Sequence, residues 1–278
     1  MIITDRFVAI NLPKTGSSFV RRVLKQLHSY EAVHNRLLRW AGLADRSGMV
    51  ELILPVIDRQ YPPNRTGQHG TVRQIPGSHR DGPIMSVVRN PLERYVSTYR
   101  FGWWKKNPHA PVEELLQVYP SYPDLAFGEY IEMMNTFGKR NRLGDMQPRT
   151  DVGFQTVQFL QFFCEDPKRL LSNLNDDAVE QQHYREALAE VTFLHQERLN
   201  EELHDFLVKS GYPEEDVAFV LQARPVNVTP GKAGKVDLAA HYSGALARQV
   251  IQQERVLFDL FPEYRAPAQN LLELRGGI

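Results

Sequence analysis

Short apolar runs followed by helical periodicity occur twice in the first part of the chain. The first run, Phe7–Asn11, is rich in β-forming residues, and apolar residues then recur at helical spacing over Phe19–Leu27. The second run, Ile84–Val88, is followed by a proline and by helical periodicity over Leu92–Trp104. Pro91 fits the first turn of a helix, because its missing N–H has no intrahelical partner there. Each segment is therefore predicted to form a strand, a tight loop and a helix.

The rest of the chain continues this pattern. Val191–His195 predicts a third strand, followed by a helix over Glu197–Lys209 that ends near Gly211. A short strand is possible at Gly67–Val72, and further helices are expected within Arg36–Pro63 and Pro108–Tyr122 and over Leu125–Phe137, Phe154–Phe163 and Ser243–Phe261. Repeated strand–loop–helix units indicate an α/β fold with a central parallel sheet flanked by helices, whose ligands bind at the carboxyl ends of the strands. No linker or repeat interrupts the sequence, so we expect a single domain over residues 1–278.

Charge and composition restrict the kinds of molecule that the chain is expected to bind and the compartment that suits it. The 33 basic residues balance the 33 acidic ones, so no bulk positive field favours nucleic acid, and any anion site must come from local clustering. The single cysteine, Cys164, excludes an internal disulfide, suits a reducing compartment and is expected to be a buried thiol. The first residues lack the pattern of a signal peptide, and no window approaches the ~18 apolar residues of a membrane span. These features predict a cytoplasmic protein.

The loop Leu12-Pro13-Lys14-Thr15-Gly16-Ser17-Ser18 stands where the first strand gives way to a helix. The first N–H groups of a helix have no intrahelical partners and attract anions. Gly16 allows close approach of the main chain, Lys14 adds a positive charge, and the neighbouring hydroxyl groups add donors. The loop matches neither the Gly-x4-Gly-Lys-Ser/Thr pattern nor Gly-x-Gly-x-x-Gly. It is interpreted as a cradle for the phosphate end of a nucleotide, the alternative being a plain turn with a serine cap.

A second polar cluster follows the second strand. Arg89 stands at the end of that strand, and Arg94 and Ser97 lie one turn apart on the following helix. Guanidinium groups match phosphate oxygens bidentately, although a surface pair of arginine with Glu93 would explain the same residues. Since both clusters follow parallel strands, both are expected at the same edge of the sheet, which suggests a nucleotide with phosphates at two positions.

Together the two clusters resemble the sulfotransferases that use 3′-phosphoadenosine 5′-phosphosulfate (PAPS). Pro13–Ser18 resembles the family's 5′-phosphosulfate loop, and Arg89-x-Pro91-x-x-Arg94-x-x-Ser97-x-Tyr99 resembles its 3′-phosphate motif. The likeness is closest to carbohydrate sulfotransferases of the heparan sulfate 2-O type and their bacterial relatives, and the two motifs cover under a tenth of the chain. The resemblance implies a P-loop-like fold and transfer of a sulfuryl group from PAPS to an acceptor hydroxyl, on a carbohydrate or small molecule, with release of adenosine 3′,5′-bisphosphate.

The same resemblance implies a role for each matching residue. Lys14 would neutralise the leaving phosphate, and Arg89 and Ser97 would hold the 3′-phosphate. The 5′-phosphate would be held by Thr15, Gly16, Ser17 and Ser18. A late basic loop with Lys232, Gly234 and Lys235 resembles the segment that closes over the cofactor, or is an ordinary solvated loop.

A histidine between the two motifs is the candidate general base. His69 stands at the place in the order where related carbohydrate enzymes carry their base, and histidine suits proton transfer at neutral pH. Glu197 is the other candidate, and no histidine or cysteine spacing points to a metal. Trp103, Trp104, Tyr119 and Tyr122 are candidates for stacking on a sugar or for core packing. The alternatives to a sulfotransferase are a P-loop-type nucleotide kinase and a non-catalytic nucleotide-binding protein.

Overall fold

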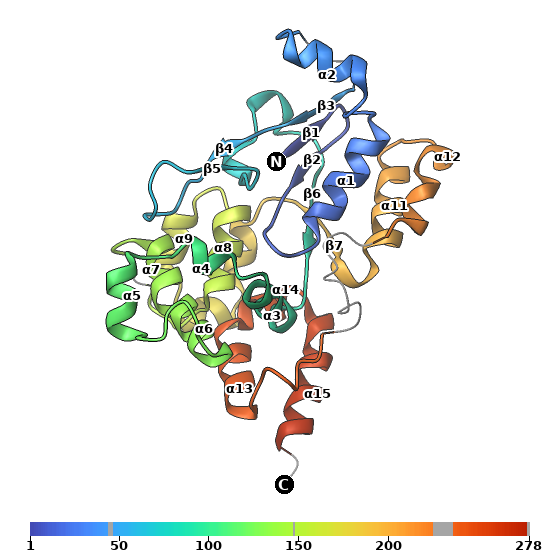
Figure 1. Cartoon of the computed structure of the whole chain (residues 1–278). Helices are drawn as coiled ribbons and strands as arrows, with labels where there is room; N and C mark the ends of the chain where they lie inside the picture. The colour runs from blue at the N-terminus through green and yellow to red at the C-terminus, as the bar shows by residue number, and fades with distance from the viewer. Residues whose placement is uncertain (44–46, 147, 225–235, 277–278) are drawn as a thin grey trace. The chain divides into compact units, whose positions relative to one another are not determined.

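A five-stranded mixed sheet organises the first of two units into which the chain divides in the computed structural model, which describes residues 1–43, 47–146, 148–224 and 236–276. The first unit comprises residues 1–55, 66–89 and 190–233, and the second comprises residues 56–65, 90–189 and 234–278. Each unit is therefore assembled from separate parts of the chain. The α/β class predicted from the sequence is confirmed (Figure 1).

The sheet has the order β3-β1-β2-β6-β7 (β3 Met49–Glu51, β1 Ile2–Thr4, β2 Val8–Ile10, β6 Ile84–Val88, β7 Thr192–His195). The three strands expected from the sequence, β2, β6 and β7, are parallel neighbours. The predicted central parallel sheet is confirmed for these three strands only, because β1 runs antiparallel to both β2 and β3 and makes the sheet mixed. The Thr4 hydroxyl oxygen accepts the N–H groups of Arg6 and Phe7 at 3.2 and 3.0 Å and so stabilises the tight turn between β1 and β2.

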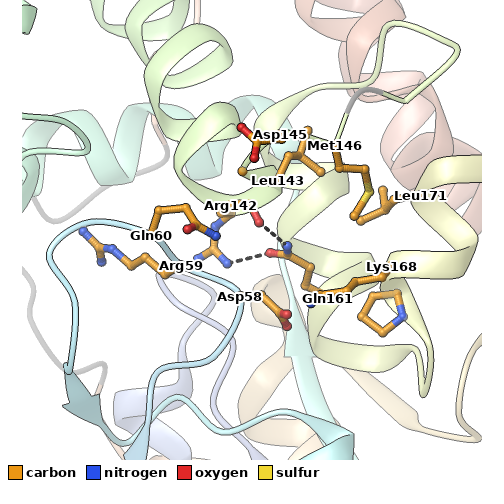
Figure 2. A pocket seen from close by; sticks show the side chains of 12 residues that line it. Asp58, Arg59, Gln60, Arg142, Leu143, Asp145, Met146, Gln161, Lys168 and Leu171 are labelled. Atoms are coloured by element: carbon orange, nitrogen blue, oxygen red, sulfur yellow. Dashed lines mark hydrogen bonds between the residues drawn. The ribbon is translucent and has the colours of Figure 1, made fainter.

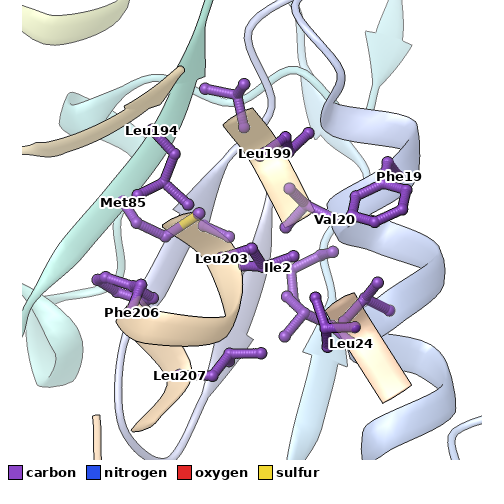
Figure 3. Close-up of a cluster of buried hydrophobic side chains, with 14 of the residues drawn as sticks. Ile2, Phe19, Val20, Leu24, Met85, Leu194, Leu199, Leu203, Phe206 and Leu207 are labelled. Atoms are coloured by element: carbon purple, nitrogen blue, oxygen red, sulfur yellow. The ribbon is translucent and has the colours of Figure 1, made fainter. Parts of the chain in front are cut away.

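The apolar core of the first unit lies on one face of this sheet. Side chains two positions apart in a strand share a face, and Phe7 with Ala9 and Met85 with Val87 belong to one buried cluster. Two helices, α1 (Ser17–Leu27) and α11 (Leu199–Lys209), add their apolar faces to that cluster, as Figure 3 shows. The cluster therefore fixes both helices against the strand ends from which they start.

Smaller elements complete the first unit. They are α2 (Val33–Trp40), α12 (Glu214–Val217), the strand pair β4 (Leu54–Pro55) and β5 (Thr66–Gly67), and the 3-10 turns η1 (Val72–Gln74), η2 (Gly77–His79), η5 (Gln196–Arg198) and η6 (Ala218–Gln222). The short strand expected at Gly67–Val72 is mostly wrong, since only Gly67 is in a strand and Val72 begins a turn. The reason is local: the main-chain N–H of Thr71 donates to Gln74 Oε1 at 3.1 Å and bends the chain.

The second unit is helical. It contains α3 (Pro91–Phe101), α4 (Trp103–Lys106), α5 (Val112–Val118), α6 (Phe127–Met133), the π turn η3 (Met134–Gly138), α7 (Lys139–Leu143), α8 (Phe154–Phe163), α9 (Pro167–Asn173), α10 (Asp176–Glu180), η4 (His183–Ala187), α13 (Gly244–Gln253), α14 (Arg255–Leu260), η7 (Pro262–Tyr264) and α15 (Arg265–Gly276). The helix predicted over Phe154–Phe163 is confirmed, and Cys164 is buried as expected.

Two predicted helices are each broken into two. The helix expected over Leu92–Trp104 is interrupted at Gly102, whose φ of 66° is left-handed and ends α3. The helix expected over Ser243–Phe261 is interrupted at Glu254, whose buried carboxylate accepts hydrogen bonds from the N–H groups of Gln155 and Thr156 at 3.1 and 2.7 Å. Burial raises the pKa of Glu254, and these hydrogen bonds oppose the shift. Neither interruption could be predicted from helical periodicity alone.

Candidate active site

The loop between β2 and α1 has the backbone geometry of an anion cradle. Lys14 and Gly16 have φ angles of 64° and 113°, on either side of Thr15, which is outside the left-handed region. Alternation of this kind turns successive N–H groups toward one side of the chain. Among the described residues no side chain caps α1, and its first turn contains no acidic residue. The partial positive charge of the helix N-terminus therefore remains available to an anion.

Gly16 is required at its position for two reasons. Its φ of 113° is unfavourable for any residue with a side chain. A Cβ atom there would also lie 2.9 Å from Leu199 Cδ2 and 3.4 Å from Gln196 Cγ, in the turn that follows β7. The loop therefore packs closely against the segment that follows β7.

The hydroxyl residues of the loop are not equivalent. Thr15 is fully buried, and its Oγ1 donates a hydrogen bond to the carbonyl of Leu12 at 2.9 Å. That hydroxyl stabilises the loop itself, so Thr15 would donate a hydrogen bond to an anion through its main-chain N–H. Ser17 is buried and Ser18 is half-buried. Among the three side chains, that of Ser18 is the most accessible.

Two cations from distant parts of the chain meet at this loop. Lys14 follows β2 and Arg89 follows β6, and the parallel pairing of Ile10 with Ser86 brings both strand ends to the same edge. Burial, and after it the positive charge of Arg89, lowers the pKa of Lys14 from 10.5 to about 8. A bound anion would relieve both effects, because it would neutralise the repulsion and stabilise the charged ammonium. The prediction that Lys14 and Arg89 lie at the same edge of the sheet is confirmed by this pairing.

His69 is held against the end of β2. Its Nδ1 lies 2.7 Å from the main-chain carbonyl of Asn11, and because a carbonyl only accepts, Nδ1 carries the proton and Nε2 is the basic nitrogen. Asn11 Nδ2 donates a hydrogen bond to the carbonyl of Gln68, the residue before His69, at 3.3 Å. The chain thus places the imidazole beside the strand that leads into Lys14. The alternative base, Glu197, lies exposed on η5.

The remaining motif residues lie elsewhere. Ser97 is half-buried on α3 and belongs to the second unit, whereas Lys14, His69 and Arg89 belong to the first. Arg94 is buried and donates from Nη1 to Gln155 Oε1 at 3.3 Å, which gives it a role in packing α3. The predicted residues Lys232, Gly234 and Lys235 lie outside the described residues.

The aromatic residues considered for sugar stacking are mostly core residues. Trp104, Tyr119 and Tyr122 are buried, with exposed fractions of 1%, 5% and 7%. Trp103 is 38% exposed, but the guanidinium of Arg65 lies 4.4 Å from its ring centroid. Neither Arg65 nor Arg59, which also lies over the Trp103 ring, could be recognised from the sequence, because neither stands in a motif or at the end of a predicted strand.

Comparison with known proteins gives no family assignment. No protein-family model matches the chain, and a search of curated proteins gives no match. Over the described ranges, no helix has the length and apolar character needed to cross a membrane. The same residues contain no group of three or more histidine, cysteine, aspartate or glutamate side chains arranged to hold a metal ion. The residues of the candidate site are therefore what indicates a function for this chain.

Proposed function

We propose that this chain is a PAPS-dependent sulfotransferase with a P-loop-like fold. The observation that carries the proposal is the placement of Lys14 and Arg89 together at a loop whose backbone conformation suits an anion, with His69 beside the same strand end. Phosphate needs cations and main-chain donors together, and this loop has both. The loop also fits a phosphosulfate because α1 has no acidic residue in its first turn.

The reaction would transfer a sulfuryl group supplied by PAPS to an acceptor hydroxyl. In it, the acceptor oxygen forms a bond to sulfur while the bond between sulfur and the 5′-phosphate oxygen breaks and its electron pair remains on that phosphate. Lys14 would stabilise the charge that develops on the departing oxygen, and the N–H groups of the loop would hold the 5′-phosphate. Arg89 would bind the 3′-phosphate.

His69 would receive the proton of the acceptor hydroxyl on Nε2. The hydrogen bond from Nδ1 to the Asn11 carbonyl supports this role, because it orients the ring and leaves Nε2 as the basic nitrogen. A carbohydrate or another hydroxyl-bearing small molecule is the proposed acceptor.

Calorimetry with adenosine 3′,5′-bisphosphate tests the proposal directly. We expect saturable one-to-one binding that does not require Mg²⁺, and sulfation of an acceptor when labelled PAPS is supplied to a panel of glycans. Equal or tighter binding of ATP with Mg²⁺ would favour a nucleotide kinase instead. Binding of the bisphosphate with no transfer to any acceptor would favour a non-catalytic nucleotide-binding protein.

The base is tested separately with His69→Asn. The asparagine amide retains a donor near the position of Nδ1 but cannot accept the hydroxyl proton at neutral pH. We expect kcat to fall by roughly 10²–10⁴-fold, with nearly unchanged affinity for the bisphosphate. His183→Asn, at an exposed position, is the control and should retain full activity. Near-normal turnover of the His69 variant would contradict the assignment.

A further inference from the structure

Three arginines and one histidine gather inside the second unit. Arg59 and Arg65 come from the loop of residues 56–65, and their guanidinium carbons lie 5.7 and 4.4 Å from the ring centroid of Trp103. Arg142 comes from α7. Burial lowers the pKa of His109 to about 3, and the charges of all three arginines add to that shift. His109 therefore stands within the electrostatic reach of every member of this group, which we call the arginine cluster (Arg59, Arg65 and Arg142).

Each guanidinium of the cluster is only partly hydrogen-bonded. Arg59 Nε donates to the carbonyl of Tyr61 at 2.6 Å, Arg65 Nη2 donates to Asn107 Oδ1 at 2.8 Å, and Arg142 Nη1 donates to Gln161 Oε1 at 2.9 Å. The described residues offer no partner to three further nitrogens, which are buried: Arg59 Nη2, Arg65 Nη1 and Arg142 Nε. Buried donors are normally satisfied, and a guanidinium left in this way calls for an acceptor.

The charges of the cluster are incompletely balanced. Burial lowers the pKa of Arg59 and of Arg142, and in both cases the charge of a neighbouring arginine adds to the effect. Asp58 opposes the shift of Arg142. A cavity of about 240 Å³ adjoins two members of the cluster, and its charged lining residues are Asp58, Arg59, Arg142, Asp145 and Lys168 (Figure 2). The cluster and this lining together contain more positive than negative side chains.

The loop that provides two of the arginines is fastened to α7. Asn141 is 4% exposed, and its Oδ1 accepts the N–H groups of Gln60 and Tyr61 at 3.0 and 2.6 Å. Its Nδ2 donates to the carbonyl of Tyr61 at 2.7 Å. Because Asn141 immediately precedes Arg142, the hydrogen bonds that fix the loop also fix it relative to the third arginine. The cluster is therefore a built feature of the second unit and not a set of solvated side chains.

We propose that the arginine cluster binds a tetrahedral oxyanion, a sulfate or phosphate group. Guanidinium groups match such oxygens in bidentate fashion, and the anion would supply acceptors to the buried donors and offset the mutual repulsion. The adjoining cavity far exceeds the roughly 30 Å³ that one water molecule occupies in the liquid, so it has room for part of a molecule that bears the group. This inference does not depend on the proposed sulfotransferase activity.

The test uses the full chain with Lys14→Met, so that the loop in the first unit contributes less to anion binding. Sodium sulfate, sodium phosphate and glucose 6-sulfate are titrated by calorimetry, with sodium chloride at matched ionic strength as the reference. We expect saturable binding that weakens at least tenfold in Arg65→Gln and in Arg142→Gln. Arg140→Gln is the matched control, since Arg140 lies on the same helix but is exposed and paired with Glu114 at 2.6 Å. That variant should bind as the parent does.

A spectroscopic readout on the protein with all three arginines present distinguishes a loss of binding from a failure of a variant to fold. The ring signals of His109, assigned by comparison with His109→Gln, should move with sulfate concentration in the protein with the arginine cluster intact. Tighter binding of glucose 6-sulfate than of the inorganic ions would show that the oxyanion belongs to a larger ligand. Equal binding of all three would show that the ligand is a free ion. Either result supports the proposal. Absence of saturable binding, or equal weakening in Arg140→Gln, would overturn it. Failure of adenosine 3′,5′-bisphosphate to bind would refute only the proposed function.

Discussion

The two groups of cations in this chain arise in different ways. In the first unit, Lys14 and Arg89 directly follow neighbouring parallel strands, and the N-terminus of α1 adds main-chain donors at the same edge. In the second unit, the arginine cluster comes from a loop and a short helix that side-chain hydrogen bonds join. The first arrangement follows from regular strand–loop–helix topology, whereas the second depends on one buried asparagine. Cations at strand ends can therefore be recognised from local motifs in the sequence, whereas cations brought together by a loop cannot.

The largest effect is expected from Lys14→Ala. Loss of the charge that stabilises the leaving phosphate should lower kcat by roughly 10²–10³-fold, with a smaller loss of affinity for adenosine 3′,5′-bisphosphate. Arg89→Ala should show the reverse pattern, because its charge would act on the bound 3′-phosphate throughout the reaction. Steady-state kinetics and calorimetry separate the two, with the exposed Lys106→Ala as control. If both variants lost only affinity, the division of roles within the first unit would be wrong.

Asn141→Ala tests whether the second group of cations depends on a single tether. Removing the side chain leaves the N–H of Tyr61 without its partner, whereas the N–H of Gln60 keeps the main-chain carbonyl of Asn141 and the carbonyl of Tyr61 keeps Arg59 Nε. The free energy of unfolding should therefore fall by about 1–3 kcal/mol. Sulfate binding by the arginine cluster should fall with it, while bisphosphate binding in the first unit should persist. Denaturant titration of this variant and of Asn173→Ala, which is exposed, provides the measurement. Equal stability of the two variants would remove the contrast between the units.

Gly16→Ala probes the conformational requirement of the first site. The left-handed φ of 113° and the approach of Leu199 should lower the free energy of unfolding by about 1–3 kcal/mol. Gly77→Ala is the matched control, because a Cβ there would meet nothing within 4 Å, and it should change stability by no more than ~0.5 kcal/mol. Chemical denaturation compares the two. A neutral Gly16 variant would mean that the loop relaxes readily and that its geometry is not fixed by the fold.

The pH dependence of nucleotide binding should give the smallest effect. Lys14 has a lowered pKa of about 8 in the free protein, and a bound phosphate favours its protonated form. Affinity for adenosine 3′,5′-bisphosphate should therefore be full below pH 8 and fall by up to about tenfold per pH unit above it. The phosphates themselves are already fully ionised there, since their second pKa is ≈6. Calorimetry from pH 7 to 9.5 measures the decline, and a Lys14→Met variant should show none.

The sequence predicted the parts of this protein that depend on local periodicity. The strands that lead to the candidate site, the helices after them and the position of Pro91 in the first turn of α3 were all readable from apolar spacing. Since parallel strands end at the same edge, the meeting of Lys14 and Arg89 also followed from the pattern. The strands β1 and β3 escaped prediction because neither leads into a helix, and β2, β6 and β7 were recognised from the strand–loop–helix pattern.

Tertiary structure alone decided what depends on contacts between distant residues. It determined that Thr15 uses its hydroxyl within the loop, that His69 turns its Nδ1 to the Asn11 carbonyl, and that a side chain on Gly16 would meet Leu199. It also brought Arg59 and Arg65 to Arg142 through hydrogen bonds to Asn141, across 80 positions in the sequence. Apolar periodicity indicates which residues are buried and where an element begins, because both depend on residues that are close in the sequence. Side-chain partners are chosen by packing between remote segments, and that choice leaves no periodic trace in the sequence.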